Sequence, residues 1–458
     1  MTHPPELSGG LPWLGHALEF RRNPVALLGR GRARFGDVFS FRLAGSRVTA
    51  LTGPRAQAAF FQAPDDQLSA REVYRFMIPI FGRGVAYDAV PEVMDEQMGF
   101  FFPALREERL QAYARVMQDE VERYCHGWGE SGEIDLLAAM NELTVFIAGR
   151  CLVGDVFRQS LSREFAELYR DLEGGINLLA FVNPYLPLPS LRRRDRARRR
   201  VGELIGRLVR ERRAGVGEGE DFLQTLLEAR YSDGSALDDE IITGLLLAIV
   251  FAGQHTSAIL STWTGLLLFQ HPEHLAPLRA EQAEVFGSYA DVSLPALDRL
   301  EMLERCIKEA ERMHPPLVVL MRKVLRDFAY GECVVPAGEL ALVSPAVSHR
   351  IPEVFRDADR YDPDRFGPSR QEDRVAKYSL IAFGGGRHRC IGSTFAYQQI
   401  KVIWSSLLQR FDFTTSTERP APDYSTFVVG PRPPCRVRYR LRAGGTLRRP
   451  AVAIQPAT

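Results

Sequence analysis

The longest apolar stretch of the chain runs from Ile241 to Phe269, and within it only His255 can carry a charge. As a helix, this stretch is long enough to cross a bilayer at about 1.5 Å per residue. The polar run Gly253-Gln254-His255-Thr256-Ser257 lies at its centre, however, where polar groups facing lipid are costly and no second span would shelter them. The pattern therefore predicts a long helix through the core of a large protein.

Signals for the two ends of this helix lie in the flanking residues. Ser235, followed by the acidic residues 238–240, places hydrogen-bond acceptors and negative charge before the apolar run. Pro272 follows the run and is typical of the end of a helix. We therefore expect the helix to begin after this polar segment and to stop before Pro272.

The rest of the chain is mainly helical in pattern. Apolar positions with helical spacing, separated by Pro and Gly, run from about Leu105 to Met313. Short β-rich stretches occur earlier, at Val38 to Leu43 and at Val48 to Leu51, and the segment from Val318 to about Phe383 is Pro-rich and irregular. The pattern predicts a mainly α fold with small β-sheets (α+β).

The composition fits one large globular domain. The chain has 458 residues, of which 45% are hydrophobic, so it can bury a large core and lacks the signature of disorder. No internal repeat or long linker divides residues 1–441, which we expect to form a single domain. Residues 442–458 have the composition of a tail, or of the start of a linker to a fused electron carrier.

The charges nearly cancel, with 58 basic and 57 acidic side chains and a formal net charge of +1. No overall field therefore favours nucleic acid or a membrane as the main partner. The exception is the run from Arg192 to Arg200, which we interpret as a solvated helix face; a partner or an anionic membrane surface is the alternative. No base-stacking aromatic residues accompany the run, so we expect no nucleic-acid partner.

The cysteines and the N-terminus indicate the compartment. No Cys-x-x-Cys pair suggests a zinc site or a redox dithiol, and widely spaced cysteines fit a reducing cytosol. The six are Cys125, Cys151, Cys306, Cys333, Cys390 and Cys435. From Met1 to Trp13 no basic region precedes an apolar run, so no signal peptide or membrane anchor is visible. We expect a soluble, cytoplasmic protein.

One cysteine has a special setting, in Phe383-Gly384-Gly385-Gly386-Arg387-His388-Arg389-Cys390-Ile391-Gly392. The glycines would let the backbone approach a flat ligand closely. A helix-like run from Thr394 to Leu408 follows, and a helix start and three basic neighbours both favour thiolate over thiol at Cys390. The alternatives are an anion-binding glycine loop and a buried structural cysteine.

The spacing Phe-x-x-Gly-x-His-x-Cys-x-Gly resembles the haem-binding signature of the cytochrome P-450 superfamily, and the resemblance runs from about Gly10 to Tyr439. Glu309 and Arg312 lie three residues apart, on one helix face. With Arg365 they resemble the structural lock of that superfamily, although an ordinary surface ion pair is the alternative. The resemblance implies the cytochrome P-450 fold, with the long central helix over the haem.

Three segments resemble the sterol 14α-demethylase family in particular: residues 251–257, 74–88 and 314–322. A lone histidine in an apolar helix is usually a core residue. With Gly253 before it and Thr256 beside it, proton delivery by His255 and Thr256 is the better interpretation. The chain resembles the bacterial members of the family, which are fed by a soluble ferredoxin system.

The resemblance implies haem b (iron protoporphyrin IX) as the cofactor, with Cys390 as the axial thiolate and Phe383 and Gly386 in the loop beside it. The donors expected to bind the haem propionates are Tyr74, Tyr87, Arg322 and His388. The side chains expected to line an apolar sterol cavity are Phe76, Met77, Phe81, Ala252, Leu317, Phe427 and Val428. One contact departs from the family: the helix that usually gives a propionate a basic residue reads Glu96-Gln97-Met98-Gly99.

The function that the resemblance implies is oxidative removal of the sterol 14α-methyl group by three successive monooxygenations. The substrate would be a lanosterol- or obtusifoliol-type sterol. Each round would use O2 and two electrons from a ferredoxin-type donor with its NAD(P)H reductase. The alternatives are a P-450 hydroxylase of another polycyclic terpenoid and, in a different class, a haem-binding sensor without turnover. Phenylalanine at position 76 resembles the plant-type enzymes, which take sterols with a single C4 methyl group.

Overall fold

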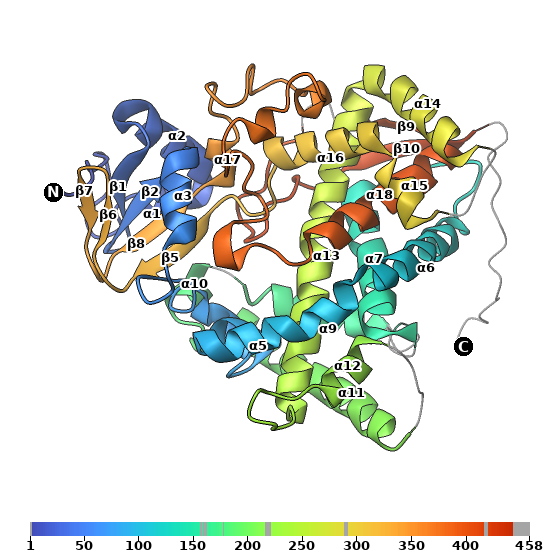
Figure 1. The fold of residues 1–458 in the computed structure, drawn as a ribbon, viewed down its shortest axis with the longest axis horizontal. Helices are drawn as coiled ribbons and strands as arrows, with labels where there is room; N and C mark the ends of the chain where they lie inside the picture. Colours follow the sequence, from blue (N-terminus) through green and yellow to red (C-terminus); the bar gives the residue numbers. More distant parts are fainter. Residues whose placement is uncertain are drawn as a thin grey trace.

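The computed structural model describes residues 2–155, 158, 163–176, 178–215, 221–287, 292–415 and 420–442. Most of the expected tail, residues 443–458, lies outside this range. Helices predominate, in agreement with the predicted fold class (Figure 1). The helices are α1 (Ala17–Arg22), α2 (Pro24–Phe35), α3 (Pro54–Gln62), α4 (Ile78–Phe81), α5 (Pro91–Phe101), α6 (Glu107–Cys125), α7 (Leu136–Ala148), α9 (Arg163–Glu173), α10 (Leu178–Val182), α11 (Pro189–Arg213), α12 (Phe222–Glu228), α13 (Asp239–Gln270), α14 (Leu275–Phe286), α15 (Leu294–Asp298), α16 (Glu301–Met313), α17 (Pro345–Ser348) and α18 (Ser393–Arg410).

The predicted central helix is α13, and it passes through the middle of the molecule (Figure 1). Its N-cap is Asp238, whose carboxylate accepts a hydrogen bond from the Ile241 amide at 2.7 Å. Ser235 lies too early in the chain to cap the helix. Both α13 and the segment Leu136–Val153 are long and apolar enough to cross a membrane, but most of each apolar window is buried inside the protein. They are core helices here.

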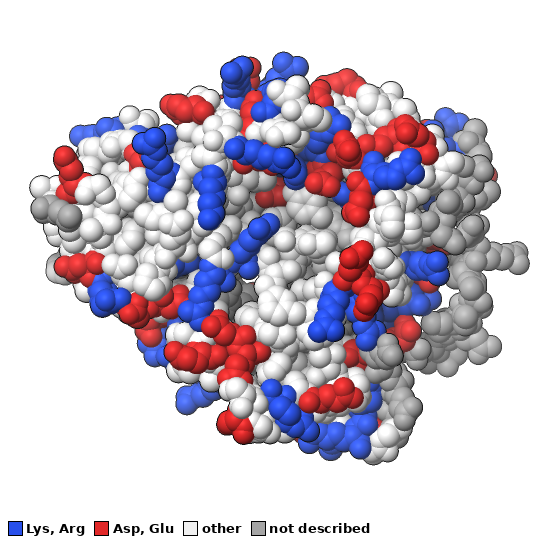
Figure 2. All heavy atoms as spheres, viewed as in Figure 1, with Lys and Arg blue, Asp and Glu red and all other residues white. Residues whose placement is uncertain are grey.

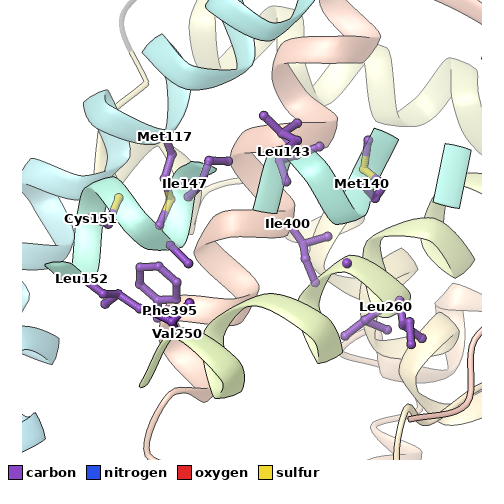
Figure 3. Close-up of a cluster of buried hydrophobic side chains, with 14 of the residues drawn as sticks. Met117, Met140, Leu143, Ile147, Cys151, Leu152, Val250, Leu260, Phe395 and Ile400 are labelled. Atoms are coloured by element: carbon purple, nitrogen blue, oxygen red, sulfur yellow. The ribbon is translucent and has the colours of Figure 1, made fainter. Parts of the chain in front are cut away.

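The core forms where α6, α7, α16 and α18 pack against one another and around α13. Figure 3 shows Met117 of α6, Leu143 of α7, Leu260 of α13 and Ile400 of α18 in one apolar cluster. The contact between α13 and α18 requires a small residue: a Cβ atom on Gly265 would lie 2.3 Å from the Trp404 ring. Glycine at this position therefore allows α18, and the loop before it, to approach the central helix.

Three small sheets complete the fold. The largest has the order β1-β2-β8-β5-β3 and joins Val38–Leu43, Ser46–Leu51, Leu340–Val343, Leu320–Val324 and Leu68–Ser69. The second has the order β4-β10-β9, from Ser131–Asp135, Arg436–Leu441 and Phe411–Thr415, and the third pairs β6 (Phe328–Tyr330) with β7 (Cys333–Val335). The prediction of irregular chain from Val318 onward was therefore wrong as far as Val343. Pairing between β5 and β8 supplies the hydrogen bonds that the local sequence does not reveal.

Candidate active site

Cys390 lies in the loop before α18, three residues ahead of the helix. Its backbone N–H donates to the carbonyl oxygen of Phe383 at 2.9 Å, which closes the loop into a compact turn. Cys390 is accessible to solvent, whereas four of the other cysteines are buried and Cys333 is partly buried. Of the six thiols, that of Cys390 is therefore the best placed to bind a ligand.

The loop glycines allow close packing against protein, and their predicted approach to a flat ligand stays a prediction. Gly384 and Gly386 have φ angles of +70° and +62°, which favour glycine. A Cβ atom on Gly386 would lie 2.1 Å from the carbonyl oxygen of Phe61 at the end of α3, and one on Gly385 would lie 2.6 Å from the Tyr378 ring. The glycines thus let the loop pack against protein on this side, which fixes the position of Cys390.

The surroundings of Cys390 act on the pKa of its thiol in opposite directions. Although the residue is accessible, protein atoms crowd its thiol, and this burial raises the pKa of Cys390; the Gly392 N–H and the Arg389 charge oppose the rise. Arg387 and His388 are engaged elsewhere, because both contact the Asp65 carboxylate at 3.1 and 2.6 Å. Deprotonation of this cysteine is therefore coupled to metal binding, as is general for thiolate ligands.

The four predicted propionate ligands form two pairs near this loop. The rings of Tyr74 and Tyr87 stack with centroids 4.8 Å apart. Buried Arg322 donates to the carbonyl oxygen of Phe60 at 2.8 Å, and the nearby Asp65 charge opposes the lowering of the Arg322 pKa by burial. Arg322 and His388 therefore both lie near one carboxylate, that of Asp65, and the two phenols form a separate pair. Such a donor set fits the carboxylates of a haem.

The stretch that lacks the expected basic residue has a structural role. Gln97 on α5 is buried, accepts from the Ala86 N–H at 2.9 Å and donates to the Gly84 carbonyl at 2.7 Å. It thereby holds the loop that carries Tyr87. On the same helix, the Asp95 carboxylate contacts the Arg387 guanidinium at 2.5 Å. The basic side chain beside this part of α5 therefore comes from the cysteine loop and not from α5 itself.

The middle of α13 has an accessible surface, although most of the helix is buried. Ala252 is exposed, and Gly253 and Thr256 are partly so. The Thr256 hydroxyl donates to the Ala252 carbonyl at 3.1 Å. A Cβ atom on Gly253 would lie 3.8 Å from the ring of Phe395, which is five residues beyond Cys390. The polar centre of α13 and the cysteine loop therefore belong to one region.

The side chain of His255 contacts a different part of the protein from that of Thr256. Its Nδ1 atom lies 3.0 Å from the Glu173 carboxylate at the end of α9, and both side chains are about one quarter exposed. Glu173 was missed in the sequence, because no local signal indicates that α9 crosses α13 at this position. The histidine is therefore linked to a carboxylate near the surface as well as to the centre of α13.

Three of the seven predicted cavity residues make contacts between aromatic rings. Phe76 contacts Phe427 at a ring distance of 5.5 Å and Phe181 at 5.8 Å, and Phe81 contacts Phe251 at 5.8 Å. Met77 is buried, Leu317 and Val428 are half-buried, and Phe427 is exposed. Phe181, Phe251 and Tyr169 were missed: the ring of Tyr169 packs on Phe251 at 4.6 Å. Aromatic residues are common in helix cores, so sequence alone does not separate them from cavity residues.

Glu309, Arg312 and Arg365 meet in the interior, and all three side chains are fully buried. Arg312 donates to both carboxylate oxygens of Glu309 at 2.7 and 2.9 Å, and Arg365 donates to the same carboxylate at 2.9 Å. Arg365 also pairs with Glu372 at 2.7 Å. The exposed ion pair considered as an alternative is excluded by this burial. The network joins α16 to the irregular segment before the cysteine loop.

Comparison with known proteins identifies the family. A family model described as Cytochrome P450 matches residues 4–437. The chain belongs to the cytochrome P450 family. A retinoic acid-bound cyanobacterial P450, CYP120A1, has the same fold with a TM-score of 0.86 and 24% sequence identity, covering 96% of this chain and 100% of that one. The predicted P450 fold is thereby confirmed.

Curated relatives narrow the family further. The obtusifoliol 14-alpha demethylase of Triticum aestivum and the sterol 14alpha-demethylase of Mycobacterium tuberculosis are each 41% identical, over 96% of this P450 and 98% of the relative. The lanosterol 14-alpha demethylase of Mus musculus is 36% identical over 96% of this chain and 88% of its own. This P450 is therefore a haem-thiolate monooxygenase of the sterol 14-demethylase family, as the sequence motifs predicted, and its cofactor is cysteine-ligated haem b.

Proposed function

We propose that this P450 removes the 14α-methyl group of a sterol by three successive oxidations, through alcohol and aldehyde. The group would leave as formate, with a new double bond in the sterol ring. The observation that carries the proposal is the near-complete match to sterol demethylases from plants, mycobacteria and a mammal. The apolar aromatic cluster beside the accessible centre of α13 supports it.

The residues around Cys390 would hold the cofactor. Cys390 would be the single protein ligand to iron; in the described part of the chain no group of three or more His, Cys, Asp or Glu side chains could hold a metal instead. Arg322, His388, Tyr74 and Tyr87 would bind the propionates, with Phe383 and Gly386 in the loop beneath. When bound, haem supplies the activation of O2.

Proton delivery would use the polar centre of α13. The Thr256 hydroxyl already donates to the Ala252 carbonyl, so this residue can pass a proton by rotating its hydroxyl group. The His255 imidazole would receive protons from solvent through Glu173, 3.0 Å away.

Phe76, Met77, Phe81, Ala252, Leu317, Phe427 and Val428 would orient the sterol. Phe76 is buried and held by Phe181 and Phe427, so it presents a fixed surface. A fixed ring discriminates between sterols that differ by a methyl group, because overpacking costs about 1–3 kcal/mol. We infer a preference for an obtusifoliol-like sterol with a single C4 methyl group over lanosterol.

A ferredoxin-type protein with its NAD(P)H reductase would supply the electrons, and the enzyme would act in the cytoplasm. Arg389 beside Cys390 and Arg387 in the same loop are exposed. They would attract an acidic carrier to the side of the molecule where the iron ligand lies. The donor and the compartment follow the pattern expected of a bacterial member of the family.

The test is a reconstituted reaction with each sterol, a ferredoxin and its reductase, followed by identification of products. Demethylated sterol and formate, formed in equal amounts, support the proposal. A hydroxylated product that keeps the methyl carbon would instead indicate a hydroxylase of polycyclic terpenoids. Sterol binding seen in the haem spectrum without oxygen consumption would indicate a sensor.

A further inference from the structure

A buried acid and a phenol meet between α16 and α18, and the site described so far uses neither. Glu311 of α16 is only 2% exposed. Its carboxylate accepts a hydrogen bond from the hydroxyl group of Tyr397 on α18. Among the described residues no basic side chain forms an ion pair with Glu311; Lys308, on the same helix, pairs with Glu304 at 3.3 Å instead. A buried carboxyl group without a cationic partner is costly when ionised, so this acid has a reason to hold its proton.

The phenol connects this acid to the cysteine loop. The ring of Tyr397 contacts the ring of Phe383, with centroids 5.8 Å apart. Phe383 begins the loop, and its carbonyl oxygen accepts the Cys390 N–H at 2.9 Å. Glu311 is therefore two contacts away from the segment that carries the iron ligand.

The two helices that carry this link are fixed to each other. Lys401 of α18 donates to the carboxylate of Glu304 on α16 at 2.7 Å. Arg312, which follows Glu311 directly in the chain, belongs to the fully buried ion-pair network of α16. The acid therefore cannot move away from Tyr397 without disturbing contacts on both helices.

The charges that face Glu311 come from its own helix, from the cysteine loop and from the turn Glu372–Arg374. Burial raises the pKa of Glu311 to about 7; the Tyr397 hydrogen bond and the charges of Lys308 and Arg389 lower it, and Asp373 raises it. Other titratable groups on α14, α17, α18 and the segment Pro363–Phe366, which pack against α16, have partners of their own: Glu281, His349, Lys401 and Arg365.

Exposed charges are a weaker influence on the loop than this acid. On the face that Figure 2 draws, acidic and basic side chains are mixed over the region where Figure 1 shows α16. Water and salt screen such exposed charges, and opposite signs offset each other. A single carboxylate in the interior is screened much less. Its ionisation therefore changes the electrostatic potential at the cysteine loop.

We propose that Glu311 is a positioning residue that acts through Tyr397 on the cysteine loop, and that gain or loss of its proton sets how readily the haem iron is reduced. An ionised carboxylate here disfavours an added electron, so the electron donor reduces ferric to ferrous iron more easily when Glu311 is protonated. By linkage, the ferrous protein binds this proton more tightly, and reduction by one electron draws a fraction of a proton from solvent onto the Glu311 carboxylate. This coupling requires the haem-thiolate centre of the family but not the proposed sterol reaction.

The experiment is a potentiometric titration of the full-length, haem-loaded protein at a series of pH values, for the wild type and Glu311→Gln. The ferrous carbonyl spectrum first checks that each protein holds thiolate-ligated haem. As the pH rises through 7, the equilibrium constant for reduction should fall about three- to tenfold more in the wild type than in Glu311→Gln, and tenfold corresponds to about 59 mV for one electron. Haem-binding groups also titrate, so the difference between the two proteins is the quantity measured.

Tyr397→Phe tests the route. It removes the hydrogen bond that lowers the pKa of Glu311 but keeps a ring against Phe383, so the inflexion in the reduction potential should move to higher pH. The matched control is Glu281→Gln. Burial also raises the pKa of Glu281, but this acid accepts from the Met302 N–H at the other end of α16, so the variant should keep the wild-type profile.

Parallel profiles for the wild type and Glu311→Gln would overturn the proposal. An equal change in Glu281→Gln would do the same, because the effect would then belong to the helix and not to this acid. An inflexion that stays in place in Tyr397→Phe would remove the phenol from the route. Since none of these readouts is turnover, failure of the sterol reaction would leave them unchanged.

Discussion

The two sides of α13 are built from different interactions. On the side of the cysteine loop, Glu309 binds Arg312 and Arg365 in the dry interior, and Gly386 packs directly against the backbone of Phe61. On the side of α9, α10 and α11, aromatic rings pack against one another at a tilt, and large apolar side chains are exposed. Directional, buried contacts suit a metal ligand that must stay in one place. Apolar contacts, which can slide and repack, suit a cavity that must admit a large substrate.

The largest effect should come from the loop itself. Cys390→Ala should abolish thiolate-ligated haem, because no other exposed cysteine lies among the described residues and the propionate ligands cannot replace an axial sulfur. The ferrous carbonyl spectrum measures this directly. The buried Cys306→Ala, whose thiol has its pKa raised by burial to about 12, is the control and should keep the spectrum. An unchanged thiolate band in Cys390→Ala would refute the assignment.

The second prediction concerns the buried network. Glu309→Gln leaves two buried guanidinium groups without their carboxylate and should lower the free energy of unfolding by about 3–5 kcal/mol. The matched control is Glu203→Gln, which removes another carboxylate three residues from an arginine, but on the surface of α11. It should cost less than about 1 kcal/mol. Urea denaturation gives the free energy of unfolding of both variants. Equal losses of this free energy would show that burial does not strengthen the contact between the carboxylate and its arginines.

A buried acid on α16 makes the stability of the cysteine side depend on pH. Burial raises the pKa of Glu311 to about 7, although it accepts a hydrogen bond from Tyr397 of α18. The native state therefore holds this proton more tightly than the unfolded chain does. The stabilisation is complete below the ordinary pKa of glutamate and is lost as the pH rises through 7.

Between pH 5 and 8 the wild type should accordingly lose up to about 3 kcal/mol relative to Glu311→Gln, whose amide does not titrate. The control is Glu301→Gln, an exposed carboxylate on the same helix, which should leave the pH profile unchanged. Unfolding free energies measured across this pH range decide the matter. Parallel curves for wild type and Glu311→Gln would contradict the raised pKa.

The comparison also explains what could be predicted from sequence. The central helix, the cysteine loop and the meeting of Glu309 with Arg365 follow from local motifs that carry their chemistry with them. The strand β8 did not, because its hydrogen bonds come from distant partners, whereas β5 overlaps the segment 314–322 that resembles a strand of the family. Glu173 and Phe181 were missed for the same reason: each gains its role only where α9 or α10 meets another element.

Two of the three basic neighbours that were expected to favour a thiolate at Cys390 pair with an acidic side chain instead. The sequence places three basic side chains beside Cys390, but the fold gives Arg387 and His388 to Asp65. A basic side chain close to Cys390 in sequence therefore need not act on its thiol. Likewise, Arg194 and Arg198 belong to a charged run but serve the interior, which only the packing of α11 reveals.

On the other side of α13, His255→Ala should keep haem and sterol binding but lower turnover about 10- to 100-fold, since a proton donor is lost while packing survives. Peroxide released per electron pair should rise in parallel. Glu173→Gln, which keeps the shape but not the charge beside His255, should show a smaller loss in the same direction. Oxygen and peroxide electrodes measure both. Wild-type coupling in the histidine variant would make His255 a core residue.

The smallest effect concerns which sterol fits. Phe76→Leu removes part of a ring that Phe181 and Phe427 hold in place, and the space gained should admit the second C4 methyl group of lanosterol. Relief of about 1–3 kcal/mol of overpacking corresponds to roughly 10- to 200-fold in catalytic efficiency if the pocket does not relax. Because these neighbours are aromatic and Phe427 is itself exposed, some relaxation of the pocket is expected, and the change in catalytic efficiency should lie at the lower end of this range.

The control is Val182→Ser, a change of an exposed residue on α10 near Phe181, which should not alter the preference between the two sterols. The measurement is kcat/KM for obtusifoliol and lanosterol in each protein. Equal use of both sterols by the wild type would mean that Phe76 only packs the loop, and that other residues set the preference.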